Sequence, residues 1–280
     1  MSDVTLRELP SAEPIRTVPR RGRVGRYALW QFRDYIVDRA FPTLISSVLI
    51  GYLFAAPMKS TFDREMASLP DKLIAKWGGV DAARVGMQSD FSQLFIQNVL
   101  GSLVFLGALL AMNGIVANDR KLGFYRFLFA KPVHPLHYYG QAFVLHTIGY
   151  MAVATLLLLL FGALLWPILT LPLLQTIAVM FVMYAGITFM LSAAARSDWL
   201  ALVTFTVAAK VLWAKYGESS APFARLIYLF PPLNRTSEVY SAVSMADSAP
   251  WPLLLWLGGY GMVCFVIGLV VLRYRRMAIV

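Results

Sequence analysis

Three histidines, His134, His137 and His146, are the residues of this chain best suited to metal or proton chemistry. A metal or haem site needs histidines that face one another and are oriented by further polar partners. Here two lie in one polar stretch and the third about one turn into an apolar run, which favours structural or interface roles. Cys264 is the single cysteine and lies in an apolar run, so we expect neither a disulfide nor a cysteine metal site.

The motifs of several enzyme classes are missing from the sequence. It contains no Gly-x4-Gly-Lys-Ser/Thr loop for nucleotide phosphates, no His-Glu-x-x-His, no Cys-x-x-Cys and no nucleophile elbow. We therefore expect no catalytic residues and no metal site in this chain.

Composition indicates what surrounds most of the chain. Of its 280 residues, 59% are hydrophobic and 14% are charged, whereas soluble domains are about 45–50% apolar and about 25% charged. A soluble fold cannot bury so much apolar surface, so the sequence predicts an all-α integral membrane protein. The net charge of +10 then reflects basic cytoplasmic loops rather than binding to nucleic acid.

Six segments are apolar over about the 20 residues that a membrane-spanning helix needs. These predicted spans are residues 40–58, 93–117, 142–166, 173–195, 199–216 and 252–273. Residues 1–23 are charged and contain three prolines, and they are predicted to form a disordered cytoplasmic tail.

Residues 24–39 have a helical pattern that predicts an amphipathic helix lying along the membrane surface. Gln31, Asp34 and Asp38 share one stripe, and apolar residues lie roughly opposite. The alternative is that this segment is a polar extension of the first span. Its candidate interfacial residues are Trp30, Phe32, Arg33 and Ile36.

The distribution of basic residues predicts the orientation. Most of the 25 Lys and Arg residues lie before residue 40, within Asn118–Gln141, or at the C-terminal end. Basic residues favour the cytoplasmic side, so both termini and Asn118–Gln141 are predicted to be cytoplasmic. Residues 59–92 and 217–251 then face outward. The first of these loops is expected to hold a short helix at Asp71–Trp77, and the second an interfacial or re-entrant pair of short helices.

Polar residues within the apolar runs are candidates for function in a membrane. Lys210 is the strongest, although its long side chain could reach the membrane surface. Together with Asn98 and Asn113 it forms a candidate transport path. The alternative for the two asparagines is that their amides hydrogen-bond between helices. The predicted spans contain no acidic residue, which disfavours a proton- or sodium-coupled carrier.

The cytoplasmic stretch contains Asp119, three residues, Gly123, and then Pro132-Val133-His134-Pro135. With six spans and two cytoplasmic ends, this pattern resembles the membrane subunits of ABC exporters of the ABC-2 type. That family has an acidic-x-x-x-Gly signature and a Pro-Val-Ser-Arg-like element between spans two and three. It usually has Glu at the first position and Arg at the last, so Asp119 is a conservative change and Pro135 a departure.

The resemblance implies that this stretch binds a separate ABC ATP-binding subunit, which would hold the ATP and Mg²⁺. Gly123 would allow close backbone approach, and the prolines would stop a short helix before span three. The alternative is a juxtamembrane segment that binds anionic lipid headgroups. The ATPase-coupling residues implied by the resemblance are Asp119, Arg120, Lys121, Gly123, Phe124, Arg126, Pro132, Val133 and His134.

As a whole, the resemblance implies a permease subunit without ATPase activity of its own, in a bacterial cytoplasmic (inner) membrane. It would pair with a second permease copy or a paralogue, among membrane lipids. Spans one, two and five would line a path for a hydrophobic or amphipathic substrate at the dimer interface. A non-transporting membrane anchor or assembly subunit, and an ion-coupled carrier, are the alternatives.

Overall fold

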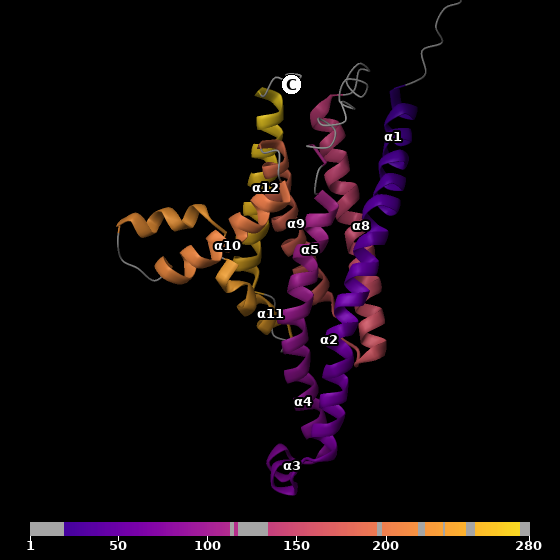
Figure 1. The fold of residues 1–280 in the computed structure, drawn as a ribbon, viewed down its shortest axis with the longest axis vertical. Helices are drawn as coiled ribbons and strands as arrows, with labels where there is room; N and C mark the ends of the chain where they lie inside the picture. Colours follow the sequence, from indigo (N-terminus) through magenta and orange to yellow (C-terminus); the bar gives the residue numbers. More distant parts are fainter. Residues whose placement is uncertain are drawn as a thin grey trace, which may run out of the picture.

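The computed structural model describes residues 20–112, 115–116, 134–194, 198–217, 222–231, 233–244 and 250–274. Every regular element in these ranges is a helix, which confirms the all-α prediction. Figure 1 shows an elongated bundle in which the start of the first helix and the end of the last one lie at the same end.

Within the described residues, five helical segments are long and apolar enough to cross a membrane. They are Ala28–Ala67, Val80–Met112, Leu136–Leu164, Leu171–Ala194 and Trp251–Leu272. They contain most of every predicted span except the fifth, so the chain is a multi-pass membrane protein. The predicted fifth span forms a helix, α10 (Asp198–Tyr216), but is not among the five.

The N-terminal helix continues directly into the first span. α1 (Arg20–Tyr35), the π-helical turn η1 (Ile36–Ala40) and α2 (Phe41–Ala67) follow one another without a break. Figure 1 shows α1 and α2 nearly in line, and Tyr35, Ala40 and Phe41 all have right-handed helical backbone angles. Residues 24–39 are therefore continuous with the helix that contains the first predicted span. Their position relative to a membrane surface stays a prediction.

The π turn η1 explains how the helix continues past Pro42. In the first turn of a helix a proline costs little, because its missing N–H has no partner there. Inside a longer helix its ring presses on the carbonyl one turn earlier. In the π turn the Phe41 amide donates to the Ile36 carbonyl, so the hydrogen-bond ladder widens by one residue. This widening accommodates the ring without a break.

The outward loop predicted at residues 59–92 is mostly helical. α2 runs on to Ala67, and the short helix α3 (Asp71–Trp77) forms as predicted. Gly78 and Gly79 then reverse the chain with φ angles of 83° and 128°, which side chains with a Cβ rarely adopt. α4 (Val80–Phe95), the π turn η2 (Ile96–Leu100) and α5 (Gly101–Met112) together form the second span.

The third, fourth and last spans complete the bundle. They are α8 (Pro135–Leu164), α9 (Leu171–Ala194) and α12 (Trp251–Tyr274). The region between α10 and α12 contains short helices, as expected. They are η3 (Pro222–Leu229), η4 (Leu233–Arg235) and α11 (Thr236–Ser244). Figure 1 shows α10 and η3 projecting sideways from the bundle.

α9 lies at the centre, and its closest neighbour is α12. A Cβ added to Gly186 of α9 would lie 1.9 Å from the Gly261 carbonyl oxygen of α12. A Cβ on Gly261 would lie 2.4 Å from the Cα of Met183. The two backbones therefore touch, as is usual where small residues let membrane helices approach.

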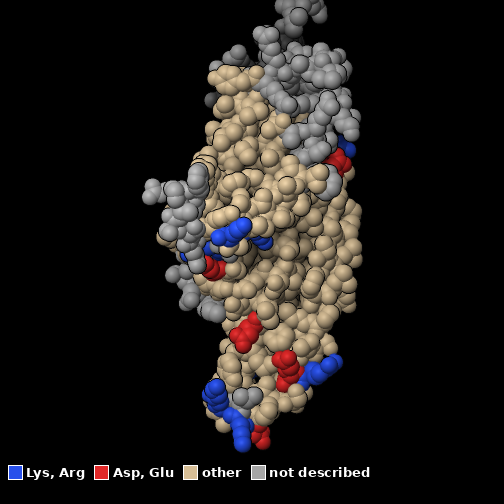
Figure 2. All heavy atoms as spheres, turned by 60° about the vertical axis from the view of Figure 1, so that its left-hand side comes forward, with Lys and Arg blue, Asp and Glu red and all other residues tan. Residues whose placement is uncertain are grey.

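Charged residues mark the two ends of the apolar stretch of the first helix. Between Arg39 and Lys59 the first helix has no charged side chain, and at 1.5 Å per residue this stretch is about 30 Å long. That length matches the hydrocarbon core of a bilayer, about 30 Å. Figure 2 shows acidic and basic side chains gathered at the lower end, where the α2–α3–α4 hairpin lies. The hairpin therefore extends beyond the apolar body.

The contact between α9 and α12 yields a stability prediction. Gly261→Leu would push a side chain into backbone, which cannot repack, so we expect a loss of at least about 1–3 kcal/mol. Gly259→Leu is the matched control, because nothing lies within 4 Å of a Cβ at that exposed position. Thermal unfolding followed by size-exclusion chromatography in detergent measures both. Equal melting temperatures for the two variants would contradict this packing.

Candidate functional site

Most of the predicted ATPase-coupling residues lie outside the residues that the structure describes. This applies to Asp119, Arg120, Lys121, Gly123, Phe124, Arg126, Pro132 and Val133, and also to Asn113 of the candidate path. What the structure does describe is where the connection containing them leaves the second span and where it enters the third.

His134 and Pro135 form the start of the third span. His134 is the N-cap of α8, and its Nδ1 accepts a hydrogen bond of 3.3 Å from the Leu136 amide. Pro135 occupies the first helical position, where a missing N–H costs nothing and a fixed φ favours the helix. The residue that departs most from the ABC-2 pattern therefore has a clear local role. His134 and His137 are exposed, with ring centroids 5.9 Å apart.

His146 lies apart from that pair, inside the bundle. It is 4% exposed, and its ring centroid is 4.8 Å from that of Tyr35. Within the part of the chain that the structure describes, its Nδ1 is buried and has no hydrogen-bond partner. The three histidines thus occupy two different places, and His146 joins the third span to the first helix.

Arg39 caps the end of the second span. Its Nη1 donates to the carbonyl oxygens of Leu110 and Ala111, at 3.3 and 2.7 Å. The last carbonyls of a helix lack partners within the helix, and a cation there also interacts favourably with the helix dipole. The sequence reading counted Arg39 only as a cytoplasmic basic residue. Its partners are backbone groups far along the chain, so no sequence motif predicts these hydrogen bonds.

A stripe at four-residue spacing forms the buried face of the first helix. Gln31 and Tyr35 begin it, Arg39 continues it, and small residues follow: Thr43, Ser47, Gly51 and Ala55. The Gln31 Nε2 donates to the Tyr138 carbonyl at 3.2 Å. A Cβ on Gly149 would lie 2.2 Å from the Tyr35 ring, and one on Gly51 would lie 2.0 Å from the Phe161 ring. The four-residue spacing of these small residues is a signal from which this face could have been predicted.

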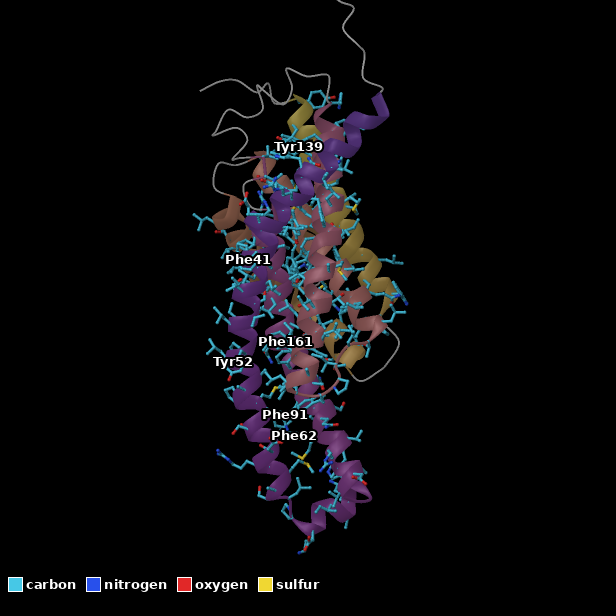
Figure 3. The ribbon with its side chains drawn as sticks, turned by 90° about the vertical axis from the view of Figure 1, so that its right-hand side faces the viewer. Phe41, Tyr52, Phe62, Phe91, Tyr139 and Phe161 are labelled. Carbon is cyan, nitrogen blue, oxygen red and sulfur yellow. The ribbon has the colours of Figure 1, made fainter. Side chains whose placement is uncertain are left out.

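The opposite face of this helix is open. Trp30, Phe32, Arg33 and Ile36, the candidate interfacial residues, are all exposed. Phe41 and Tyr52 lie at the outer edge of the bundle in Figure 3, whereas Phe161 lies within it. Gln31 was assigned to the polar stripe and is instead buried against α8, whereas Asp38 is exposed.

The described candidates for a transport path do not line the interior of the chain. The Asn98 amide donates to the Leu94 carbonyl of its own helix at 3.0 Å, and its side chain is exposed. Lys210 is exposed on α10. A path that includes them therefore needs a second surface opposite this chain.

Hydrogen bonds between polar side chains connect α11 to the second span. The amides of Gln93 and Gln97 both donate to the Ser241 hydroxyl, the former at 3.2 Å. Tyr240 beside it is buried close to Gly101, and burial raises the pKa of its hydroxyl well above the ordinary value. Hydrogen bonding between helices therefore explains why the second span contains the polar side chain of Gln97.

No protein-family model matches the chain, and no curated protein is significantly similar to it. The fold and the site therefore define a class, a multi-pass α-helical membrane protein. Its first helix is hydrogen-bonded to the end of the second span and the start of the third.

The buried face of the first helix gives a second prediction. Tyr35→Ala removes a ring that is 1% exposed and leaves a cavity, so we expect destabilisation of about 3–5 kcal/mol. Trp30→Ala removes a ring that is 52% exposed and should change stability by only about 0.5 kcal/mol. Unfolding in detergent, monitored by tryptophan fluorescence for Tyr35→Ala and circular dichroism for both, provides the comparison. A larger loss for Trp30→Ala would refute the assignment of the buried face.

Proposed function

We propose that this chain is the permease subunit of an ATP-driven exporter of the ABC-2 type, powered by a separate ATP-binding subunit. The observation that carries the proposal is the element Asp119, Gly123 and Pro132-Val133-His134-Pro135 between the second and third spans. The bounds of α5 and α8 support it, since one ends at Met112 and the other begins at Pro135. The element thus occupies the one connection that the resemblance requires.

An energy source on a separate subunit is consistent with the residues that this chain lacks. The sequence has no phosphate-binding loop, and its predicted spans contain no acidic residue that could bind and release a proton or sodium ion. Work done by such a chain has to come from a partner. In our proposal, ATP-driven closure of two ATP-binding subunits moves the 118–135 connection and changes the arrangement of the spans.

The exposed polar residues favour a path between two permease copies, or between this chain and a paralogue. Asn98 and Lys210 both point away from the interior of the chain. α10 also exposes Leu200, Val203, Val207 and Val211 at three- and four-residue spacing. A wall of this composition suits a hydrophobic or amphipathic substrate. The distribution of basic residues supports cytoplasmic termini in a bacterial inner membrane.

Co-purification tests the proposal. A soluble ATPase with a phosphate-binding loop, encoded beside this chain, should co-purify with it and hydrolyse ATP faster when bound. Replacing Gly123 and Phe124 with Glu should abolish both effects, because bulky charged groups would block close contact. Val85→Glu is the control, since Val85 is 65% exposed in the outward hairpin.

The outcomes separate the alternatives. If the ATPase stays bound and fully stimulated by the Gly123/Phe124 variant, the coupling assignment is wrong. If no ATPase binds the wild-type chain, the permease proposal fails and a membrane anchor or an ion-coupled carrier becomes the better description.

A further inference from the structure

One face of the N-terminal helix holds both ends of the connection between the second and third spans. Arg39 donates to the carbonyls of Leu110 and Ala111, in the last turn of α5. Eight residues earlier, Gln31 donates to the Tyr138 carbonyl, in the first turns of α8. These contacts join segments 71 and 107 residues apart in the sequence.

Tyr35 fills the space between these two hydrogen bonds. It lies midway between Gln31 and Arg39 on the same stripe and is 1% exposed. Its ring packs on Gly149 and beside His146. The first, second and third spans therefore meet in one continuous set of buried contacts.

The hydrogen bonds of Arg39 and Gln31 are of a kind that holds the first helix strongly to the second and third spans. Arg39 lies at the edge of the apolar stretch, where water competes little for the α5 carbonyls. A guanidinium is always charged, and its donors have fixed directions, so one nitrogen serves two carbonyls at once. Gln31 is 4% exposed, and its amide reaches a carbonyl in the first turns of α8. Loss of either side chain removes that partner from a carbonyl in a partly buried position.

We propose that Gln31, Tyr35 and Arg39 form a clamp that makes the ends of the second and third spans move with the first helix as one unit. The three are positioning residues. The clamp itself follows from the contacts above, whereas its use in transmitting ATP-driven movement rests on the proposed function. With the clamp intact, a displacement of the connection is passed to the first span. Without it, the second and third spans can move separately from the first.

Distance measurements test the clamp without any partner. Spin labels at Leu29 and Val144, which are exposed on α1 and α8, report the separation of the two helices by pulsed electron paramagnetic resonance in lipid nanodiscs. The background carries Cys264→Ala, because Cys264 is the single cysteine. We expect one narrow distance distribution for the parent chain and for the control Arg33→Met, which alters an exposed arginine of the same helix. Gln31→Ala combined with Arg39→Met should broaden and lengthen it.

Two further samples make the result decisive. Arg39→Lys keeps the charge and should keep most of the narrow distribution. Labels at Leu171 and Val263, exposed on α9 and α12, should report the same distance in all variants. An unchanged Leu29–Val144 distribution in the double variant would overturn the clamp. A parallel change in the α9–α12 pair would also overturn it, since these residues would then hold the whole bundle rather than one junction.

The functional use of the clamp is tested with the co-purifying ATPase. With the clamp intact, adding the ATP analogue AMP-PNP should leave the Leu29–Val144 distance unchanged, because both helices move together. In the double variant the ATPase should stay bound while the distance becomes nucleotide-dependent, an effect that a purely structural role would not produce. If AMP-PNP leaves the Leu29–Val144 distance unchanged in both the parent chain and the double variant, transmission through the clamp is refuted. Failure of the wild-type chain to bind any ATPase would refute the proposed function and leave the partner-free measurement to decide the clamp.

Discussion

A helix that ends within or beside a lipid bilayer leaves carbonyl groups that water cannot reach, and this constraint explains the best-defined site of the chain. The second span ends at Met112, and two of its last carbonyls accept hydrogen bonds from Arg39 of the first helix. An unsatisfied carbonyl in apolar surroundings costs several kcal/mol. A requirement of the backbone therefore helps to hold the first and second spans together, beside contacts between side chains such as that of Phe62 with Phe91.

The rest of the bundle depends on small residues. Gly186 and Gly261 bring α9 and α12 into backbone contact, and Gly149 and Gly51 receive the rings of Tyr35 and Phe161. Lipid tails are as apolar as the helices, so burial of apolar surface does little to drive helices together in a membrane. Close packing and a few polar contacts have to supply the attraction. In this chain both occur along the buried face of the first helix.

The sequence predicted what composition controls. Runs of apolar residues predicted six spans, five of which lie mostly within the long apolar helices of the described residues, and the short helix Asp71–Trp77 forms where it was predicted. It did not predict the direction of residues 24–39, because an amphipathic pattern gives the face of a helix but not its angle to the next one. Pro42 suggested a helix start, and the π turn that accommodates it has no sequence signature. The role of Arg39 was missed because its acceptors are carbonyls, which every residue has.

The unbroken first helix has a mechanical consequence. Residues 20–67 form a single rod that is about 70 Å long at 1.5 Å per residue. This is more than twice the roughly 30 Å thickness of the bilayer core, so both ends reach beyond the apolar body. A tilt of about 10° around its middle would move each end by about 6 Å, in opposite directions. When such a rod tilts about a point within the membrane, a small displacement of one end is accompanied by a displacement of the other end in the opposite direction.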